Sequence, residues 1–458
     1  MVRDFFQWIA SEDAGKFDCV VGNPPFIRYH NFPEPSRATA MNLMERLGLK
    51  PNRLTNMWVP FVAASVEFLA AGGRLAMVLP AELLQVTYAG QLRHFLAQNF
   101  QAIGLVTCND MVFPGAQQEV VLFLGLHKKE APGAGGPCAI ELVEMDSLDD
   151  LLSLSWDERV RAEQLKPVNH KTDKWLKYLL TAKEIALLKD LEQSDVTTEL
   201  GAVASVDIGV VTGRNQFFLL SRQEVAERGL SAHSMPIVAR AHHLQGAVFT
   251  TEDHARLAAE AQRVFLFVYE PLLSPPLPRA ARRYIAEGEE KGFHRGYKCS
   301  IRQPWYAVPG AWTPDCFLFR QIHDFPRLVI NRANATSTDT IHRLSCCAPP
   351  EALVARWYSH LTAASSEIEG RSYGGGVLEL EPTEAERVMI PNRPVAGLPI
   401  PEIDRLVRAG RLKDVLVEHD RLILREGLGL SRAQCAMLRG IWEKLRDRRH
   451  ARKKRKRT

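Results

Sequence analysis

The ten residues FDCVVGNPPF, at positions 17–26, join a short apolar stretch to Asn23, two prolines and a phenylalanine. Apolar residues followed by turn-forming residues predict a strand over Phe17–Gly22, and the catalytic groups of parallel sheets gather at the carboxyl ends of their strands. A residue before proline is held in extended geometry, and proline itself has a fixed φ angle. The sequence therefore predicts that Asn23 lies in a stiff loop at the end of a strand.

The loop after this strand is rich in hydrogen-bond acceptors. Neither Pro24 nor Pro25 has an N–H group, so the polar atoms available are mainly the side-chain oxygen of Asn23 and the carbonyl of Pro24. Two acceptors suit one NH2 group, and they can draw the nitrogen of an aromatic amine towards tetrahedral geometry as charge develops on it. Phe26 offers a face on which an extruded base can stack. The alternative is an Asn-Pro turn without function.

Three more strands are predicted downstream, over 74–79, 103–108 and 119–126, and helical patterns cover 57–70 and 88–100. This alternation of strands and helices predicts an α/β fold, specifically the second half of a doubly wound sheet.

Three segments carry a family resemblance. NPPF after FDCVVG resembles the catalytic motif of the amino methyltransferases; GGRLAMVLPAELL (Gly72–Leu84) and FPGAQQEVVLFLGLHK (Phe113–Lys128) resemble later motifs of the gamma-class adenine-specific DNA methyltransferases of the TaqI type, including those within Type IIG restriction-modification enzymes. The resemblance implies methyl transfer from S-adenosylmethionine to the exocyclic amine of an adenine flipped out of double-stranded DNA. It also implies that Asn23, Pro24, Pro25 and Phe26 are catalytic and that Phe113 pairs with Phe26 around the base. Core packing is the alternative role for Phe113.

Four further segments, at 208–220, 297–309, 331–344 and 372–391, resemble parts of the target-recognition domain of the same family. Arginine and asparagine suit bidentate contacts with guanine and adenine, and aromatic rings offer stacking surfaces. The residues predicted to contact DNA are Thr212, Arg214, Asn215, Arg302, Trp305, Tyr306, Arg332 and Asn334, with Thr336 beside the last two. For each of them a structural turn or a core contact is the alternative.

These patterns predict a Rossmann-like methyltransferase half-sheet, then a mixed α+β target-recognition domain and a helical carboxyl-terminal part. The expected layout is a partial catalytic domain over 1–146, a helical connector over 147–194, the recognition domain over 195–395, a helical segment over 396–445 and a basic disordered tail over 446–458.

The chain departs from the family pattern at its amino-terminal end. The family's S-adenosylmethionine site begins with a glycine-rich turn upstream of the NPP loop, and the 22 residues before Asn23 contain no such turn. Most of the cofactor site is therefore expected to be absent, and a separate amino-terminal fragment is an expected partner. Two interpretations stay open. The chain is either an adenine methyltransferase of a restriction-modification or phage-defence system, or a non-catalytic DNA-binding remnant or specificity subunit of such an enzyme.

Composition is consistent with this layout. Hydrophobic residues make up 46% of the 458, enough for two or three cores, and no apolar run is long enough to span a bilayer, so a cytoplasmic protein is expected. The eight cysteines show no zinc-site spacing, so no metal is expected. From Arg446 to Thr458 nine basic residues and one Asp give a net charge of +8, and because the whole chain carries +5, the remainder carries −3. The tail is expected to attract phosphates without reading sequence.

Overall fold

The structure is a computed structural model that describes residues 4–9, 15–108, 119–145, 150–151, 165–269, 277–373, 375–392 and 396–454. The chain forms two compact units. Unit 1 contains Met1–Asp190, Arg371–Val377 and Lys444–Thr458, and unit 2 contains Leu191–Gly370 and Leu378–Glu443. No helix in the described ranges is both long and apolar enough to cross a membrane.

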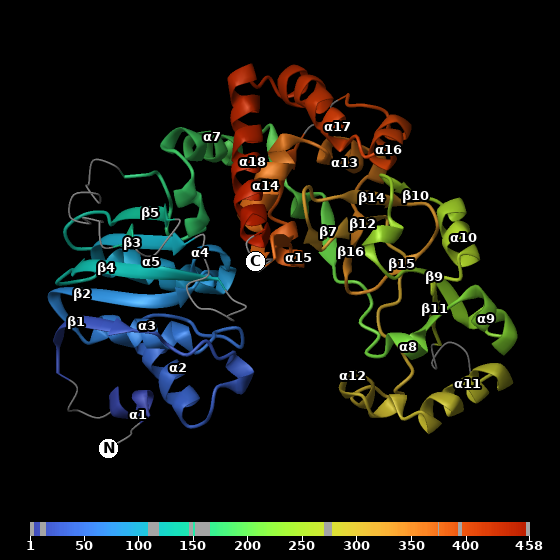
Figure 1. The fold of residues 1–458 in the computed structure, drawn as a ribbon, viewed down its shortest axis with the longest axis horizontal. Helices are drawn as coiled ribbons and strands as arrows, with labels where there is room; N and C mark the ends of the chain where they lie inside the picture. Colours follow the sequence, from blue (N-terminus) through green and yellow to red (C-terminus); the bar gives the residue numbers. More distant parts are fainter. Residues whose placement is uncertain are drawn as a thin grey trace. The chain divides into compact units, whose positions relative to one another are not determined.

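Unit 1 is built on a five-stranded sheet with the order β1-β2-β4-β3-β5 (Figure 1). Its strands are β1 (Phe17–Gly22), β2 (Leu69–Pro80), β3 (Phe100–Cys108), β4 (Val120–Lys128) and β5 (Ala139–Met145). The pairs β1–β2 and β3–β5 are parallel, whereas β4 runs antiparallel to both of its neighbours. All four predicted strands are present and the α/β prediction is confirmed; β5 was not predicted, and β2 begins five residues before the predicted start.

The core of unit 1 lies between this sheet and its helices. Alternate residues of β2 are buried, among them Leu75 and Leu79, because side chains of a strand point to opposite faces in turn. They pack with apolar residues of α3 and α5, such as Val62 and Leu96. The helices of this unit are α1 (Phe5–Ile9), α2 (Ser36–Arg46), α3 (Trp58–Glu67), α4 (Glu82–Gln85), α5 (Gly90–Asn99) and most of α7 (Ala182–Gln193); a further strand is β17 (Arg371–Tyr373).

Strand β1 is at the edge of the sheet. It pairs with β2 alone among the described strands, so its other side carries no described neighbour. The side chains of Phe17 and Val21 are 42% and 76% exposed, which is unusual for apolar residues within a strand.

Unit 2 contains several small sheets with helices packed around them (Figure 1). The largest has the order β10-β14-β12-β16-β7, and a second has the order β15-β9-β11-β8. Buried apolar side chains of both sheets, such as Val238, Phe317 and Val329, share one core. The strands are β6 (Thr197–Glu199), β7 (Ala204–Asp207), β8 (Leu219–Leu220), β9 (Ser234–Val238), β10 (Val248–Phe249), β11 (Phe265–Phe267), β12 (Cys316–Phe319), β13 (Gln321–Ile322), β14 (Leu328–Asn331), β15 (Thr336–Ser337), β16 (Ile341–Cys346), β18 (Val377–Glu379) and β19 (Met389–Pro391).

The helices of unit 2 are short, and α9, α10 and α15 each begin with a capping box, in which Ser221, Thr250 and Glu381 accept from backbone N–H groups of the first turn. The helices are α8 (Asn215–Phe218), α9 (Arg222–Arg228), α10 (Thr251–Ala259), α11 (Arg279–Glu290), α12 (Tyr297–Ser300), α13 (Pro350–Trp357), α14 (His360–Glu369), α15 (Pro382–Ala385), α16 (Ile400–Arg408) and α17 (Leu412–His419). The mixed α+β character predicted for this region is confirmed.

Helix α18 (Arg432–Lys454) begins in unit 2 and ends in unit 1. The prediction of a disordered tail from Arg446 is therefore wrong as far as Lys454, because these residues continue the helix. In the predicted connector, the described residues include a 3-10 turn over Trp175–Leu179 and helix α7, while 147–149 and 152–164 lie outside the described residues.

Candidate functional site

Asn23 directly follows the last residue of β1, as predicted. Its side chain is exposed and makes no hydrogen bond within the described part of the chain. Pro24 is buried, and Pro25 and Phe26 are half-buried. Phe26 packs against the core of unit 1, so the loop is fixed on one side of Asn23 and leaves the amide free on the other.

A backbone hydrogen bond fixes the far end of this loop. The N–H of Met57 donates to the carbonyl oxygen of Ile27, and the two atoms lie 2.8 Å apart. This bond joins the residue after Phe26 to the segment that precedes α3. The loop is therefore held by β1, by core packing of Phe26 and by this bond, and its rigidity no longer rests on proline geometry alone.

A second polar group lies after β2, the parallel neighbour of β1. The Tyr88 hydroxyl donates to the Glu82 carboxylate, and Asn56 Nδ2 lies 3.0 Å from Tyr88 Oη and 3.4 Å from Glu82 Oε2. Burial, followed by the negative charge of Glu82, raises the pKa of Tyr88 above its usual range, so the hydroxyl keeps its proton. Because β1 and β2 are parallel, the carboxyl end of β2 lies at the same edge of the sheet as the carboxyl end of β1, where the Asn23 loop begins.

Sequence reasoning did not single out this second group. Glu82 lies within the segment Gly72–Leu84, whose resemblance to a family loop was the available signal, but nothing in the spacing links it to Asn56 or Tyr88. Phe113, the predicted partner of Phe26, lies outside the described residues, so their pairing stays a prediction.

The predicted contact residues of unit 2 form three groups along the chain, around Thr212, around Arg302 and around Arg332, and the structure brings the first two together. The guanidinium of Arg302 donates to the carbonyl oxygens of Val211 and Thr212, at 2.8 Å for the latter. Gly213 has a φ of +75°, and a Cβ atom there would lie 2.6 Å from Cβ of Lys298. The loop and the segment around Arg302 are thus packed so closely that only glycine fits at position 213.

The loop between Val211 and Gln216 borders a polar cavity of about 470 Å³ that Asp339 also lines. Thr212 is buried, and its hydroxyl hydrogen bonds with the side-chain oxygen of Asn215. The side chains of Arg214 and Asn215 are exposed, and the Arg214 guanidinium lies 4.8 Å from the ring centre of Phe293. The Arg214 guanidinium and the amide nitrogen of Asn215 therefore remain available to a ligand, whereas the Asn215 side-chain oxygen accepts from Thr212.

The other predicted contact residues differ in their surroundings. Trp305 and Tyr306 pack against a hydrophobic cluster of unit 2, and the Trp305 indole donates to Glu289 at 3.0 Å. Arg332 is exposed and forms an ion pair with Glu351. Asn334 is exposed with a φ of +50°, a conformation that asparagine tolerates in tight turns. Among the described residues, the hydrogen bonds of Arg302 go to Val211 and Thr212, and Arg332 pairs with Glu351 instead.

The basic residues near the carboxyl terminus are engaged within unit 1. The Arg448 side chain is 8% exposed, forms an ion pair with Glu144, and has Nη2 3.7 Å from Glu119 Oε1 and 3.4 Å from Thr107 Oγ1. Arg449 is buried and donates to the carbonyl of Gly376 at 2.6 Å. Arg448 therefore binds the helix to the sheet, and Arg449 binds it to the turn at Gly376, which corrects their assignment to a phosphate-attracting tail.

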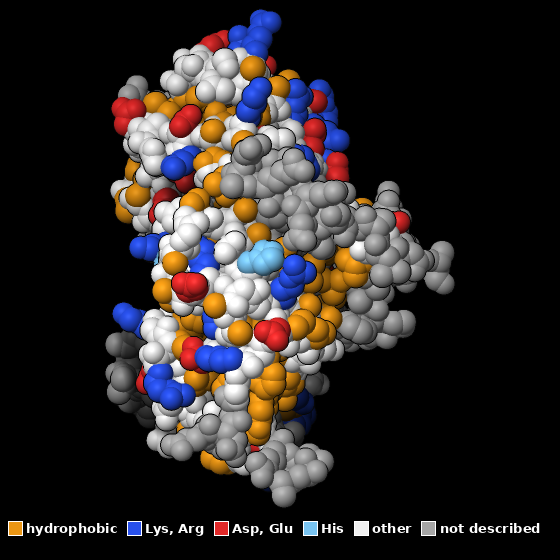
Figure 2. Space-filling view, turned by 90° about the vertical axis from the view of Figure 1, so that its left-hand side faces the viewer, with side chains coloured by type: hydrophobic (Ala, Val, Ile, Leu, Met, Phe, Trp, Pro, Cys, Tyr) orange, Lys and Arg blue, Asp and Glu red, His pale blue; other side chains and the backbone are white. Residues whose placement is uncertain are grey.

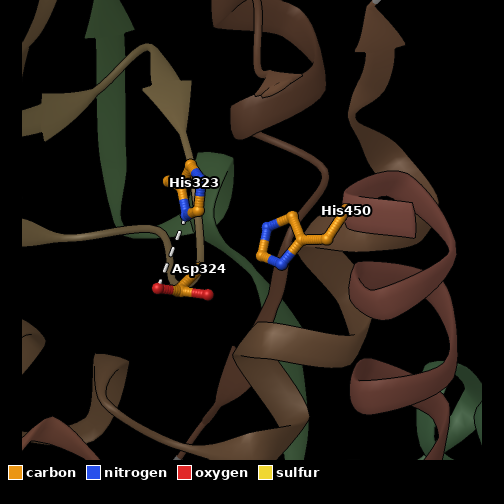
Figure 3. A group of neighbouring side chains, drawn as sticks. All are labelled: His323, Asp324 and His450. Atoms are coloured by element: carbon orange, nitrogen blue, oxygen red, sulfur yellow. Dashed lines mark ion pairs between the residues drawn. The ribbon is translucent and has the colours of Figure 1, made fainter. Parts of the chain in front are cut away.

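The face of the molecule drawn in Figure 2 carries Lys and Arg side chains interspersed with Asp and Glu, rather than gathered into one basic patch, among its described residues. A separate pair in the loop after β13, His323 and Asp324, has Nδ1 and Oδ2 3.5 Å apart (Figure 3). His450, also drawn there, belongs to the part of α18 in the other unit. The pair is exposed and contributes little to stability.

Comparison with known proteins gives the family. The model of the Type II methyltransferase M.Eco57I carboxyl-terminal domain matches residues 172–424, more than half of the chain, and the model of the Eco57I restriction-modification methylase matches residues 2–113. The chain is 20% identical to the Type II methyltransferase M.AccI of Acinetobacter calcoaceticus over 401 residues, which is 84% of this chain and 71% of that protein. It is 25% identical to M.XamI of Xanthomonas campestris pv. amaranthicola over 401 residues, 86% of this chain and 70% of that protein.

Among solved structures, the Type IIL restriction-modification enzyme MmeI is similar with a TM-score of 0.53 and 12% sequence identity, covering 94% of this chain and 57% of that one. This likeness shows the fold alone, and the chain spans little more than half of the length of MmeI. The family models match both the Asn23 loop and the region of unit 2 that holds Thr212 and Arg302. The chain therefore belongs to the family of the Type II restriction-modification methyltransferase M.Eco57I.

Proposed function

We propose that this protein methylates the exocyclic amine of adenine in double-stranded DNA at specific sites. The observation that carries the proposal is the Asn23 side chain, which is exposed and without a hydrogen-bond partner in the described residues, on a fixed loop at the carboxyl end of β1. An unpaired amide in a rigid loop is available to a ligand without first breaking a contact.

The chemistry follows from the acceptors of the loop. The Asn23 side-chain oxygen and the Pro24 carbonyl accept the two hydrogens of the target amine, which favours positive charge on its nitrogen as the new bond to carbon forms. Phe26, half-buried against the core, presents a ring for the flipped adenine. Phe113 is proposed to cover the other face of the base.

S-adenosylmethionine supplies the methyl group when bound. The described residues fit only the side of its site that faces the amine, at Asn23, because residues 1–22 of this chain contain no glycine-rich turn. No residue is therefore assigned to the rest of the cofactor. None of the comparisons supports a separate amino-terminal fragment, and its participation stays a prediction.

DNA is the proposed partner, and the fold-related MmeI has been solved in complex with DNA. In unit 2 we assign base or phosphate contacts to the exposed side chains of Arg214, Asn215, Arg332 and Asn334. Arg302 is proposed to position the loop through its two backbone contacts instead of touching DNA. The cytoplasmic location expected from the sequence belongs to this proposal, because the substrate is cellular DNA.

The test uses the protein in its source cell, so that any partner is present. DNA from cells with the intact gene and from cells carrying Asn23→Ala is compared by nucleoside mass spectrometry and by modification-sensitive sequencing. The expected result is the loss of N6-methyladenine at one sequence motif. An unchanged set of methylated motifs would contradict the proposal and favour a non-catalytic DNA-binding protein.

A further inference from the structure

Two large apolar side chains stand exposed on one short turn of unit 2. Tyr297 and Ile301, at the start of α12 and directly after its end, are 75% and 62% exposed, whereas Cys299 between them is fully buried. Single exposed apolar residues are common on protein surfaces, but two on one turn form a ridge of apolar surface.

The turn that carries this ridge is held firmly. The carbonyl of Gly296 accepts from the N–H groups of Cys299 and Ser300, both at 2.8 Å, and the Ser300 hydroxyl donates to the carbonyl of Tyr297 at 3.0 Å. Cys299 packs in the hydrophobic cluster beneath. The exposed side chains are therefore presented by a preformed backbone, which lowers the entropy cost of any contact that they make.

The same turn is joined to the loop that lines the polar cavity. Arg302, the next residue after Ile301, donates to the carbonyl oxygens of Val211 and Thr212, and Gly213 approaches Lys298 closely. The apolar ridge and the exposed polar side chains of that loop thus form one surface.

The charges on the segment that carries the ridge favour a polyanion. From Lys291 to Arg302 the sequence carries four Lys or Arg residues and no acid, and Arg295 and Lys298 are exposed; the exposed acids Glu289 and Glu290 precede this segment at the end of α11, where Glu289 accepts from Trp305. Arg214, also exposed, adds a fifth cation, while Asp339 is the acid that lines the adjacent cavity. An apolar ridge with cations beside it matches duplex DNA, whose stacked bases lie between two rows of phosphates.

We propose that Tyr297 and Ile301 form a wedge that enters a base step of bound DNA, while Lys298 and Arg295 hold the flanking phosphates. The inference rests on the proposed function, because it takes DNA as the ligand. Apolar side chains inserted between base pairs unstack the step and kink the duplex, and the unstacking costs a few kcal/mol in intact DNA. A duplex that already has a gap in its stack avoids most of that cost.

The experiment measures binding of the full chain to two 30-base-pair duplexes of mixed sequence, one intact and one with a single central abasic site, by fluorescence anisotropy. We expect tighter binding to the abasic duplex, by roughly tenfold, because its stack is already interrupted. Tyr297→Ala and Ile301→Ala should bring this ratio close to one. Val417→Ala, an exposed apolar residue on α17 at 55% exposure, is the matched control and should keep the ratio of the unaltered protein.

Lys298→Gln tests the contribution of charge to binding separately from that of the apolar wedge. It should weaken binding to both duplexes equally and reduce the salt dependence of the affinity, because a protein that makes one phosphate contact fewer releases fewer counterions when it binds. Equal binding of the unaltered protein to the two duplexes, or an undiminished ratio in Tyr297→Ala, overturns the wedge and leaves the proposed function standing. If Tyr297→Ala keeps the ratio but abolishes self-association in sedimentation, the ridge is a protein interface and the wedge is wrong. Failure of the full chain to bind either duplex overturns the wedge, whereas the proposed function is decided by the separate comparison of methylated motifs in the source cell.

Discussion

The Asn23 loop of unit 1 and the Thr212 loop of unit 2 both carry polar side chains predicted to act on DNA, but they differ in what those side chains do within the protein. Asn23 has no hydrogen-bond partner among the described residues. In the second loop, Thr212 and Asn215 bond to each other, and Arg302 is bound to two carbonyl oxygens of the loop backbone. An amide beside prolines finds few local partners, whereas an arginine near exposed carbonyls is readily captured by them.

The largest expected effect, and so the strongest test of this difference between the two loops, is at Asn23. Asn23→Ala should reduce methyl transfer at least roughly 10²-fold, the usual effect of removing one electrostatic contact to the reacting atoms. It should change the free energy of unfolding by less than about 0.5 kcal/mol, because an exposed side chain without partners holds nothing in place. Steady-state methylation and thermal unfolding of the same preparations measure both effects. A large loss of stability would show that Asn23 is structural and that the contrast between the loops is wrong.

Arg302 should show the opposite behaviour. Arg302→Ala removes two hydrogen bonds from a charged donor, and we expect the free energy of unfolding to fall by about 2 kcal/mol. Arg332→Ala is the control within the same unit, because its ion pair with Glu351 is exposed and should contribute less than about 1 kcal/mol. Denaturant titration of both variants compares them directly. Equal, small losses would mean that Arg302 is free to contact DNA, as the sequence alone suggested.

The sequence predicted the features that depend on neighbouring residues and missed those that join residues far apart in the chain. The strand Phe17–Gly22 and the position of Asn23 depend on local pattern and on proline geometry, and both were predicted correctly. The capture of Arg302 joins residues 90 positions apart, and the docking of Arg448 on Glu144 joins residues 304 positions apart. A run of basic residues is the same in sequence whether it is solvated or paired with acids elsewhere in the chain, so the helical end of the chain was mistaken for a disordered tail.

Arg448 in unit 1, like Arg302 in unit 2, is an arginine whose side chain is bound within the protein. Arg448→Ala should lower the free energy of unfolding by about 1–2 kcal/mol, because it leaves Glu119 and Glu144 beside each other without the guanidinium between them. The exposed Arg439 on the same helix serves as the matched control, and Arg439→Ala should leave stability nearly unchanged. Affinity for a mixed-sequence duplex, measured below the unfolding temperature of both variants, should be similar. A loss of DNA affinity specific to Arg448→Ala, without a loss of stability, would restore the phosphate-binding role of this residue.

The smallest effect is expected when the pH is lowered, and it compares a half-buried histidine of unit 1 with a buried histidine of unit 2. Burial lowers the pKa of His170 in unit 1 and of His243 in unit 2 to about 4 each. His170 accepts a hydrogen bond from the Trp175 indole at 3.3 Å, whereas neither ring nitrogen of His243 has a partner in the described part of the chain. Because the folded protein holds both rings neutral, their contribution to stability is complete above about pH 6.5, the ordinary histidine pKa, and is lost as the pH falls from there towards 4.

His243→Leu should therefore flatten the decline of the unfolding temperature of the full chain between pH 6.5 and 4, because a side chain without polar atoms needs neither a proton nor a partner. His170→Leu should flatten it as well but should also lower stability at pH 7.5, since the Trp175 N–H then loses its acceptor. If His243→Leu leaves the slope unchanged, the His243 ring gains its proton in the folded protein as readily as in the unfolded chain, and its burial in unit 2 is less complete than the structure indicates.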